Sequence, residues 1–209
     1  MNSEILKYLL PALIGVGGVL VGSLISLWAN YLIKSRETAL RIKEKIFDKK
    51  VKAYENLLLL TQNMRCTKKT KISDSRTIVK RYPACFKNKE TFIAFSIDYN
   101  QIGNSSHFWI DVEIIRLIDF FKNYLIELSV TIDEIPEEQF MNVGILVISD
   151  FLKHATELEN KVIKFFEIEI QKPNLKTRRG YHRFETAIYK QKMMDTDLKK
   201  NELSIINLK

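Results

Sequence analysis

An uncharged apolar run at residues 8–33 dominates the pattern of hydrophobic and polar positions along the chain. The run, YLLPALIGVGGVLVGSLISLWANYLI, contains no Asp, Glu, Lys, Arg or His. As an α-helix it would extend roughly 39 Å, more than the roughly 30 Å of a bilayer's hydrocarbon core. The pattern therefore predicts one transmembrane helix at residues 8–33, preceded by a short extracytoplasmic N-terminus at residues 1–7.

The charges on either side of this run predict its orientation. Before it, Lys7 is balanced by Glu4. Several basic residues follow it closely: Lys34, Arg36, Arg41, Lys43 and Lys45. Basic residues beside a span stay in the cytoplasm. The run is also longer than the apolar core of a secretory signal peptide. We therefore expect an uncleaved single-pass protein of a bacterial inner (plasma) membrane, with its N-terminus outside and its C-terminal domain in the cytoplasm.

Small residues recur at helical spacing inside the run. Gly18 and Gly22 form a G-x-x-x-G motif, and Ser26 continues the spacing. Such a stripe lets a second helix approach closely, which predicts a homo-oligomer packed through Gly18, Gly22 and Ser26. Gly is also common in membrane helices that do not associate. Because the run carries no Asp, Glu, Lys, Arg or His, the sequence argues against a proton relay or transport site within one helix, and a pore would need several copies.

The remaining chain has the apolar periodicity of helices, so the fold class is all-α. No Gly or Pro lies between Ser23 and Arg65, so the membrane helix is expected to continue into the cytoplasm. Apolar stripes with 3–4 spacing predict further helices at residues 107–132 and 137–171. We expect a cytoplasmic helical bundle with a basic stalk at residues 34–171, in which residues from Phe47 onward are packed, and a basic C-terminal tail at residues 172–209.

Weaker patterns fill the intervals between these helices. Residues 66–90 are polar and basic and predict a loop, with a short helix around residues 74–81 as the alternative. Residues 91–100 predict a helix and residues 101–106 a turn, whose Ser105 or Ser106 would cap the next helix. Gly144 predicts close packing or a kink. Residues 184–193 predict a short amphipathic helix, and the last 15 or so residues are expected to be loosely ordered.

The net charge of +8 is unevenly distributed. Residues 66–90 carry eight basic and two acidic side chains, residues 91–170 carry five and fourteen, and residues 171–209 carry ten and four. Three interpretations stay open: mutual neutralisation of the basic and acidic parts, contact of the basic parts with anionic lipid, and binding of nucleic acid. The lipid bilayer is the partner that the apolar run requires.

Motifs for catalysis are scarce. The chain contains no P-loop, no G-x-G-x-x-G, no G-x-S-x-G and no H-E-x-x-H. Cys66 and Cys85 are expected to be reduced cytoplasmic thiols, and with three scattered histidines they do not form a zinc motif. We therefore expect no metal and no cofactor.

One cluster with catalytic chemistry follows the last predicted bundle helix. Arg178, Arg179 and His182 occur together as RRGYH. A histidine that moves a proton and an arginine that stabilises phosphorane charge are sufficient for metal-free RNA cleavage. Helical ribonucleases of the HEPN class carry an R-x4–6-H motif, whereas here three residues separate Arg178 from His182. The alternative is a solvated basic turn or a lipid-facing patch.

This arrangement of one span, a basic stalk and a helical domain followed by RRGYH resembles the small membrane accessory proteins of type VI-B CRISPR loci. The resemblance implies a HEPN-like domain and assembly into a ring that acts as a membrane pore in antiphage defence. The first hypothesis is therefore a non-enzymatic, self-associating membrane protein that permeabilises the membrane as an antiphage-defence effector or accessory. A membrane-tethered RNase using Arg178 or Arg179 with His182 is the second. A membrane-anchored scaffold that recruits a defence-complex protein or RNA is the third.

Overall fold

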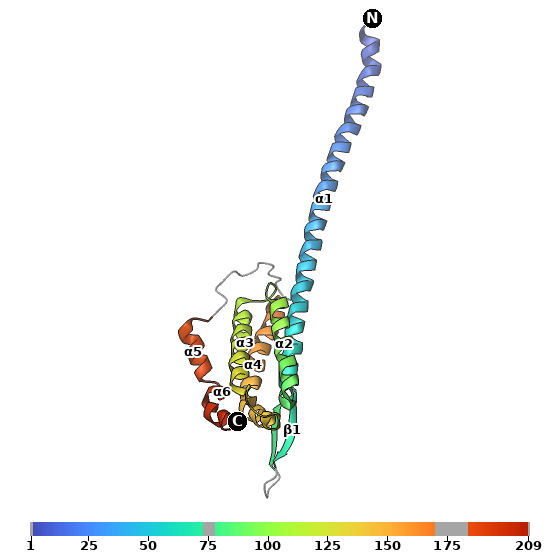
Figure 1. Ribbon diagram of the computed structural model, residues 1–209. Coiled ribbons are helices and arrows are strands. Elements are labelled where there is room, and N and C mark those ends of the chain that lie inside the picture. The colour runs from blue at the N-terminus through green and yellow to red at the C-terminus, as the bar shows by residue number, and fades with distance from the viewer. Residues whose placement is uncertain (1, 73–77, 170–183, 209) are drawn as a thin grey trace. The chain divides into compact units, whose positions relative to one another are not determined.

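The computed structural model describes residues 2–72, 78–169 and 184–208 (Figure 1). The chain divides into two compact units, Met1–Phe47 and Asp48–Lys209. The first unit consists of the N-terminal part of α1 (Asn2–Arg65), and the second contains the end of α1 with all the other elements. The described residues are mainly helical, which confirms the helical fold class that the apolar stripes predicted.

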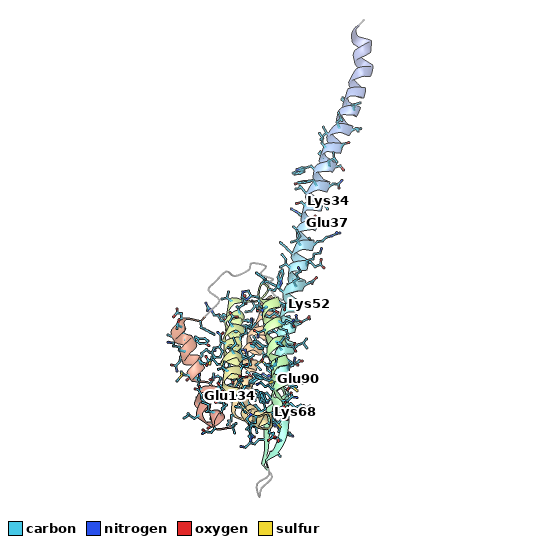
Figure 2. All side chains as sticks on the ribbon, in the orientation of Figure 1. Lys34, Glu37, Lys52, Lys68, Glu90 and Glu134 are labelled. Carbon is cyan, nitrogen blue, oxygen red and sulfur yellow. The ribbon has the colours of Figure 1, made fainter. Side chains whose placement is uncertain are left out.

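α1 is one helix from the apolar run to Arg65, as the absence of Gly and Pro after Ser23 predicted. Its last four turns bury an apolar stripe against the rest of the second unit: Ala53, Tyr54, Leu57, Leu60 and Met64. Before this stripe the helix is largely exposed, and the labelled Lys34 and Glu37 extend from it in Figure 2. The amphipathic pattern therefore begins where the second unit begins.

A β-hairpin follows α1, and the prediction of a loop or short helix at residues 66–90 was wrong. β1 (Thr67–Ile72) pairs antiparallel with β2 (Ile78–Pro83), with Thr67 opposite Pro83 and Ile72 opposite Ile78. Residues 74–77 of the predicted helix lie outside the described residues. β-branched residues in both segments favour extended backbone, and Tyr82 is buried in the core, so tertiary packing supports a strand that has little apolar alternation.

A short 3-10 helix, η1 (Ala84–Lys87), leads from the hairpin into α2 (Lys89–Ser106). Asn88 and Thr91 form a capping box, in which the Asn88 side chain accepts a hydrogen bond from the Thr91 amide at 2.9 Å. The helix predicted at residues 91–100 is confirmed, but the turn predicted at 101–106 is wrong. α2 continues because Gly103 lies against Ile118, whose Cγ2 would be 2.8 Å from an added Cβ.

The two strongest apolar stripes form the centre of the bundle. They are α3 (Val112–Ile132) and α4 (Phe140–Glu169), the latter preceded by η2 (Glu137–Gln139). α3 starts after an N-cap at Asp111, five residues later than predicted, so neither Ser105 nor Ser106 caps it. Close packing at Gly144 is confirmed, since an added Cβ would lie 2.7 Å from Cβ of Phe86.

The C-terminal residues are ordered into α5 (Thr186–Met194), α6 (Asp197–Lys200) and α7 (Glu202–Ile206). The short helix predicted at residues 184–193 is confirmed, whereas the expected loose ordering of the last residues is wrong. Leu198 and Ile205 are buried in the core, so this end contributes to folding. Figure 1 shows α2, α3 and α4 side by side, with α5 and α6 on the side of α3 away from α2.

Candidate functional site

The apolar segment of α1 is the candidate membrane-contact surface. Among the described residues, α1 is the one helix long and apolar enough to cross a membrane, and no residue of its most apolar window is buried. Most of the described large apolar side chains in this segment are more than half exposed, including Val19, Leu24 and Trp28 at 66–68 %, while Leu32 is 39 % exposed. A continuous exposed apolar surface of this kind is unfavourable in water and favourable in lipid or against another chain.

The three residues predicted to pack helix against helix lie on this surface. Gly18, Gly22 and Ser26 are spaced by four residues on α1, so they follow one inclined stripe, and all three are exposed. A Cβ added to Gly18 or Gly22 would have no atom within 4 Å apart from its own helix. No other part of the chain therefore covers the stripe, and its small side chains would let a second helix approach closely.

Residues typical of a membrane–water boundary lie at the C-terminal end of the same segment. Trp28 and Tyr31 are 67 % and 71 % exposed. Lys34 follows within one turn of Tyr31 (Figure 2). Aromatic rings followed by basic side chains are enriched at the cytoplasmic boundary of a span.

Within the bundle, His154 is a buried group whose pKa is strongly shifted and whose side chain has possible catalytic chemistry. His154 stacks on Phe121, with ring centroids 4.3 Å apart, and its Nε2 is hydrogen-bonded to the Tyr99 hydroxyl at 2.9 Å. Burial, with a smaller contribution from Lys192, lowers the pKa of His154 to about 3. The ring is therefore neutral near pH 7, and its contacts are those of a core residue rather than of a general base open to substrate.

Asp150 connects the bundle to the C-terminal helices. Its carboxylate accepts hydrogen bonds from the Tyr124 hydroxyl at 2.9 Å and from the amides of Asp197 and Leu198 at 2.8 and 3.0 Å. Burial raises the pKa of Asp150, and burial also raises the pKa of Tyr124. This arrangement satisfies the first amides of α6 and explains why the C-terminal residues are ordered.

Two hollows lie beside these residues. A pocket of about 110 Å³, lined by Tyr124, Asp150 and His154 among others, is smaller than the roughly 300–1,000 Å³ of small-molecule sites. A groove of about 480 Å³ adjoins it and is lined by acidic and basic side chains. Its two lysines are paired with carboxylates, Lys161 with Glu113 and Lys192 with Glu157. These pairs reduce the attraction of the groove for an anionic ligand.

The remaining sequence candidates are the RRGYH cluster and the two cysteines. Arg178, Arg179 and His182 lie outside the described residues, so the proposed RNase cluster stays a prediction. Cys66 is exposed and Cys85 is partly exposed, and both are free. Burial raises the pKa of Cys85 to about 12, so it is a thiol and a poor nucleophile at pH 7. No group of three or more potential metal ligands occurs in the described ranges.

Sequence reasoning missed the roles of Asp150 and His154. The one available signal is their position in α4, where each occupies a place on the apolar face at helical spacing. A polar residue on a buried face needs a partner, but the partners Tyr99 and Asp197 lie 55 and 47 residues away. Neither a family model, nor a curated protein, nor a solved structure matches this chain.

Proposed function

We propose that this chain is a single-pass inner-membrane protein that associates with copies of itself through the Gly18, Gly22 and Ser26 stripe. In this proposal the apolar segment of α1 spans the bilayer once, with the N-terminus outside. The basic residues from Lys34 onward hold the bundle in the cytoplasm, because basic flanks resist translocation.

The observation that carries the proposal is the open stripe on an exposed apolar helix. A Cβ added at Gly18 or Gly22 would have no atom within 4 Å apart from its own helix. In lipid, helices associate through close van der Waals contact, and small residues permit that contact. A glycine in a helix costs about 1 kcal/mol relative to alanine. Association offers a physical gain that offsets this cost at both positions.

Assembly of several spans is the step that gives the protein its proposed activity. One uncharged helix offers no polar path through the hydrocarbon. A group of helices that separates or tilts can admit water and ions, so the oligomer permeabilises the membrane. Bacterial antiphage defence is the setting that the resemblance to CRISPR accessory proteins implies. A signal that arises on infection and acts on the cytoplasmic bundle would then open the assembly.

The mass of the full-length protein in detergent micelles tests the association. We expect a discrete oligomer for the natural chain and a shift toward monomer for Gly18→Leu/Gly22→Leu. The matched control is Gly17→Leu/Val21→Leu, which has the same spacing on a different face of the helix and which the account expects to stay oligomeric. In liposomes, chemical cross-linking should capture oligomers of the natural chain and of the control, and it should capture fewer of the stripe variant. A natural chain that is monomeric in both detergent and liposomes would exclude the proposal.

Two alternatives stay predictions. The RNase hypothesis requires that His182→Ala abolish RNA cleavage or toxicity, and unchanged cleavage would remove it. The scaffold hypothesis requires that reversal of charge in the basic tail, Arg178→Glu/Arg179→Glu, abolish binding of a partner while oligomers persist.

A further inference from the structure

The bundle carries an apolar patch that the membrane segment does not explain. It consists of Ile93 and Ile97, one turn apart on α2, and Ile126 and Val130, one turn apart on α3. Their exposed fractions are 49, 56, 59 and 73 %. We call these four residues the α2/α3 patch. Single exposed apolar residues are ordinary, but two pairs at one-turn spacing on neighbouring helices are less so.

Two contacts between α2 and α3 place the two pairs at the same height along the bundle. The helices run antiparallel as neighbours (Figure 1). At one end Lys89 pairs with Asp133 at 3.1 Å, and further along Lys122 donates a hydrogen bond to Asn104 at 2.8 Å. Between these two contacts α2 contributes Ile93 and Ile97, and α3 contributes Ile126 and Val130. The four side chains are therefore level with one another.

The patch has polar neighbours, and charged side chains lie around it. Four exposed neighbours on the same two helices are uncharged: Ala94, Asn100, Asn123 and Ser129. Two exposed carboxylates also lie on α2, Glu90 one turn before Ile93 and Asp98 next to Ile97. Ion pairs lie at the two ends of the patch, Lys89 with Asp133 and Lys122 with Asp119. Depletion of charge at the centre, with charge confined to the rim, distinguishes the core of a protein–protein interface from ordinary surface.

We infer that the α2/α3 patch binds the same patch of a second copy of this chain, an inference that rests on the proposed self-association. Rotation about an axis parallel to the two helices preserves height, so the level pairs of one copy meet the level pairs of the other. Such an interface is isologous: α2 of one copy lies against α3 of the other, and Ile97 opposes Ile126 twice.

The area of the patch is sufficient only for copies that are already held close together. Four half-exposed side chains cover on the order of a few hundred Å², whereas a stable complex buries roughly 800 Å² on each partner. The patch is thus too small to hold free bundles together at low concentration. Confinement in one membrane raises the effective concentration of the bundles, and under that condition a small apolar contact is sufficient.

Lysine substitutions in the patch test this inference on the full-length protein in detergent. Ile97→Lys/Ile126→Lys should raise the concentration of half-dissociation at least tenfold, measured by light scattering. Ile163→Lys/Leu203→Lys is the matched control, because it changes two exposed apolar residues elsewhere on the bundle, 45 and 78 % exposed. The control should keep the mass of the natural chain.

A complementation experiment tests the geometry. A copy with Ile97→Glu and a copy with Ile126→Lys should each associate weakly alone. Mixed, they place a glutamate opposite a lysine and an isoleucine opposite an isoleucine, so association should return.

The two proposals fail in distinguishable ways. If the patch variant keeps its mass while Gly18→Leu/Gly22→Leu dissociates, the inference is overturned and the proposed function stands. If the mixture fails to recover, the face-to-face arrangement is wrong. If the natural chain is monomeric, both are overturned.

Discussion

The glycines of the two units differ in what surrounds them. At Gly18 and Gly22 an added Cβ would have no neighbour within 4 Å, whereas at Gly103 and Gly144 it would lie 2.8 and 2.7 Å from a side-chain carbon. In the bundle, the space that glycine leaves is filled by the chain itself. In the apolar segment it is empty. Gly103 and Gly144 are therefore packed against other parts of the chain, whereas Gly18 and Gly22 are not.

The large apolar residues show the same difference. Leu24 and Trp28 are 66 and 67 % exposed, while Phe121 and Phe151 are at most 1 % exposed. Burial from water stabilises the bundle as it folds. The apolar segment gains nothing comparable within one chain, so under the proposed function its energetics depend on lipid and on other copies. Substitutions should therefore act on bundle stability in one unit and on insertion or association in the other.

The largest contrast is expected for buried and exposed apolar truncations. Phe151 contacts the rings of Phe86, Phe95, Phe121 and Tyr124. Phe151→Ala should lower the free energy of unfolding by about 3–5 kcal/mol, since it removes buried surface and leaves a cavity. Leu24→Ala should leave it unchanged. Urea unfolding in micelles, followed by Trp109 fluorescence in a Trp28→Phe background, measures both. Equal losses of unfolding free energy for Phe151→Ala and Leu24→Ala would contradict the energetic difference between the two units.

The glycines give the next contrast. Gly144→Ala should cost about 1–3 kcal/mol of bundle stability, because its Cβ would overlap Phe86 and Tyr82. Gly18→Ala meets open space and should change bundle stability by less than about 0.5 kcal/mol. The same unfolding assay compares them. A tolerated Gly144→Ala would show that η1 and α4 are less closely packed than the structure has them.

Acid should weaken the bundle through His154. The folded pKa, about 3, lies below the unfolded value of 6.5, so the folded state binds fewer protons. The stabilisation is complete above pH 6.5 and is lost as pH falls toward 3. The loss is about 1.4 kcal/mol per pH unit in that range, or about 2 kcal/mol between pH 7 and pH 5.

The Tyr99→Phe/His154→Phe variant checks this pH dependence. It removes both partners of the buried hydrogen bond, so neither polar group is left unpaired. Its stability should vary less between pH 7 and pH 5 than that of the natural chain, by the amount assigned to His154. The same slope in both proteins would show that His154 is accessible to protons in the folded state.

The smallest effect is expected at the surface. Lys161 and Glu113 form an ion pair that is 42 and 64 % exposed. The pair lowers the pKa of Glu113, chiefly through the hydrogen bond from Lys161. Lys161→Ala should nevertheless change bundle stability by less than about 1 kcal/mol, because water and salt screen exposed charges. A larger loss at high salt would indicate that the Lys161 side chain contributes through packing.

The helices with wide apolar stripes were predictable because burial on one face dictates their pattern. The stripes of α3 and α4 needed no knowledge of partners, and close packing at Gly144 was one of two predicted outcomes. The hairpin was missed because its strands are rich in lysine. It is specified by the pairing of Thr67 with Pro83 and by Tyr82 in the core, which only the folded chain brings together.

The predictions of where α2 and the C-terminal helices end were wrong for the same reason. α2 continues through a turn-like sequence because Gly103 meets Ile118, and the C-terminal helices are held by Asp150. These contacts join residues separated by at least fifteen positions, so no local pattern contains them. The stripe of Gly18, Gly22 and Ser26 was visible in the sequence because its spacing is local.

Thiol labelling in intact spheroplasts tests most directly whether α1 crosses the membrane once. Cys66 is exposed, and the raised pKa of Cys85 suppresses its reactivity, so the natural chain carries one reactive reporter beside the bundle. Asn2→Cys adds a second reporter at the N-terminus. With a membrane-impermeant maleimide and spheroplasts, the account predicts that Cys66 reacts only after lysis, whereas the thiol at position 2 reacts before lysis. Labelling of Cys66 in intact spheroplasts, or recovery of the chain away from the membrane fraction, would contradict it.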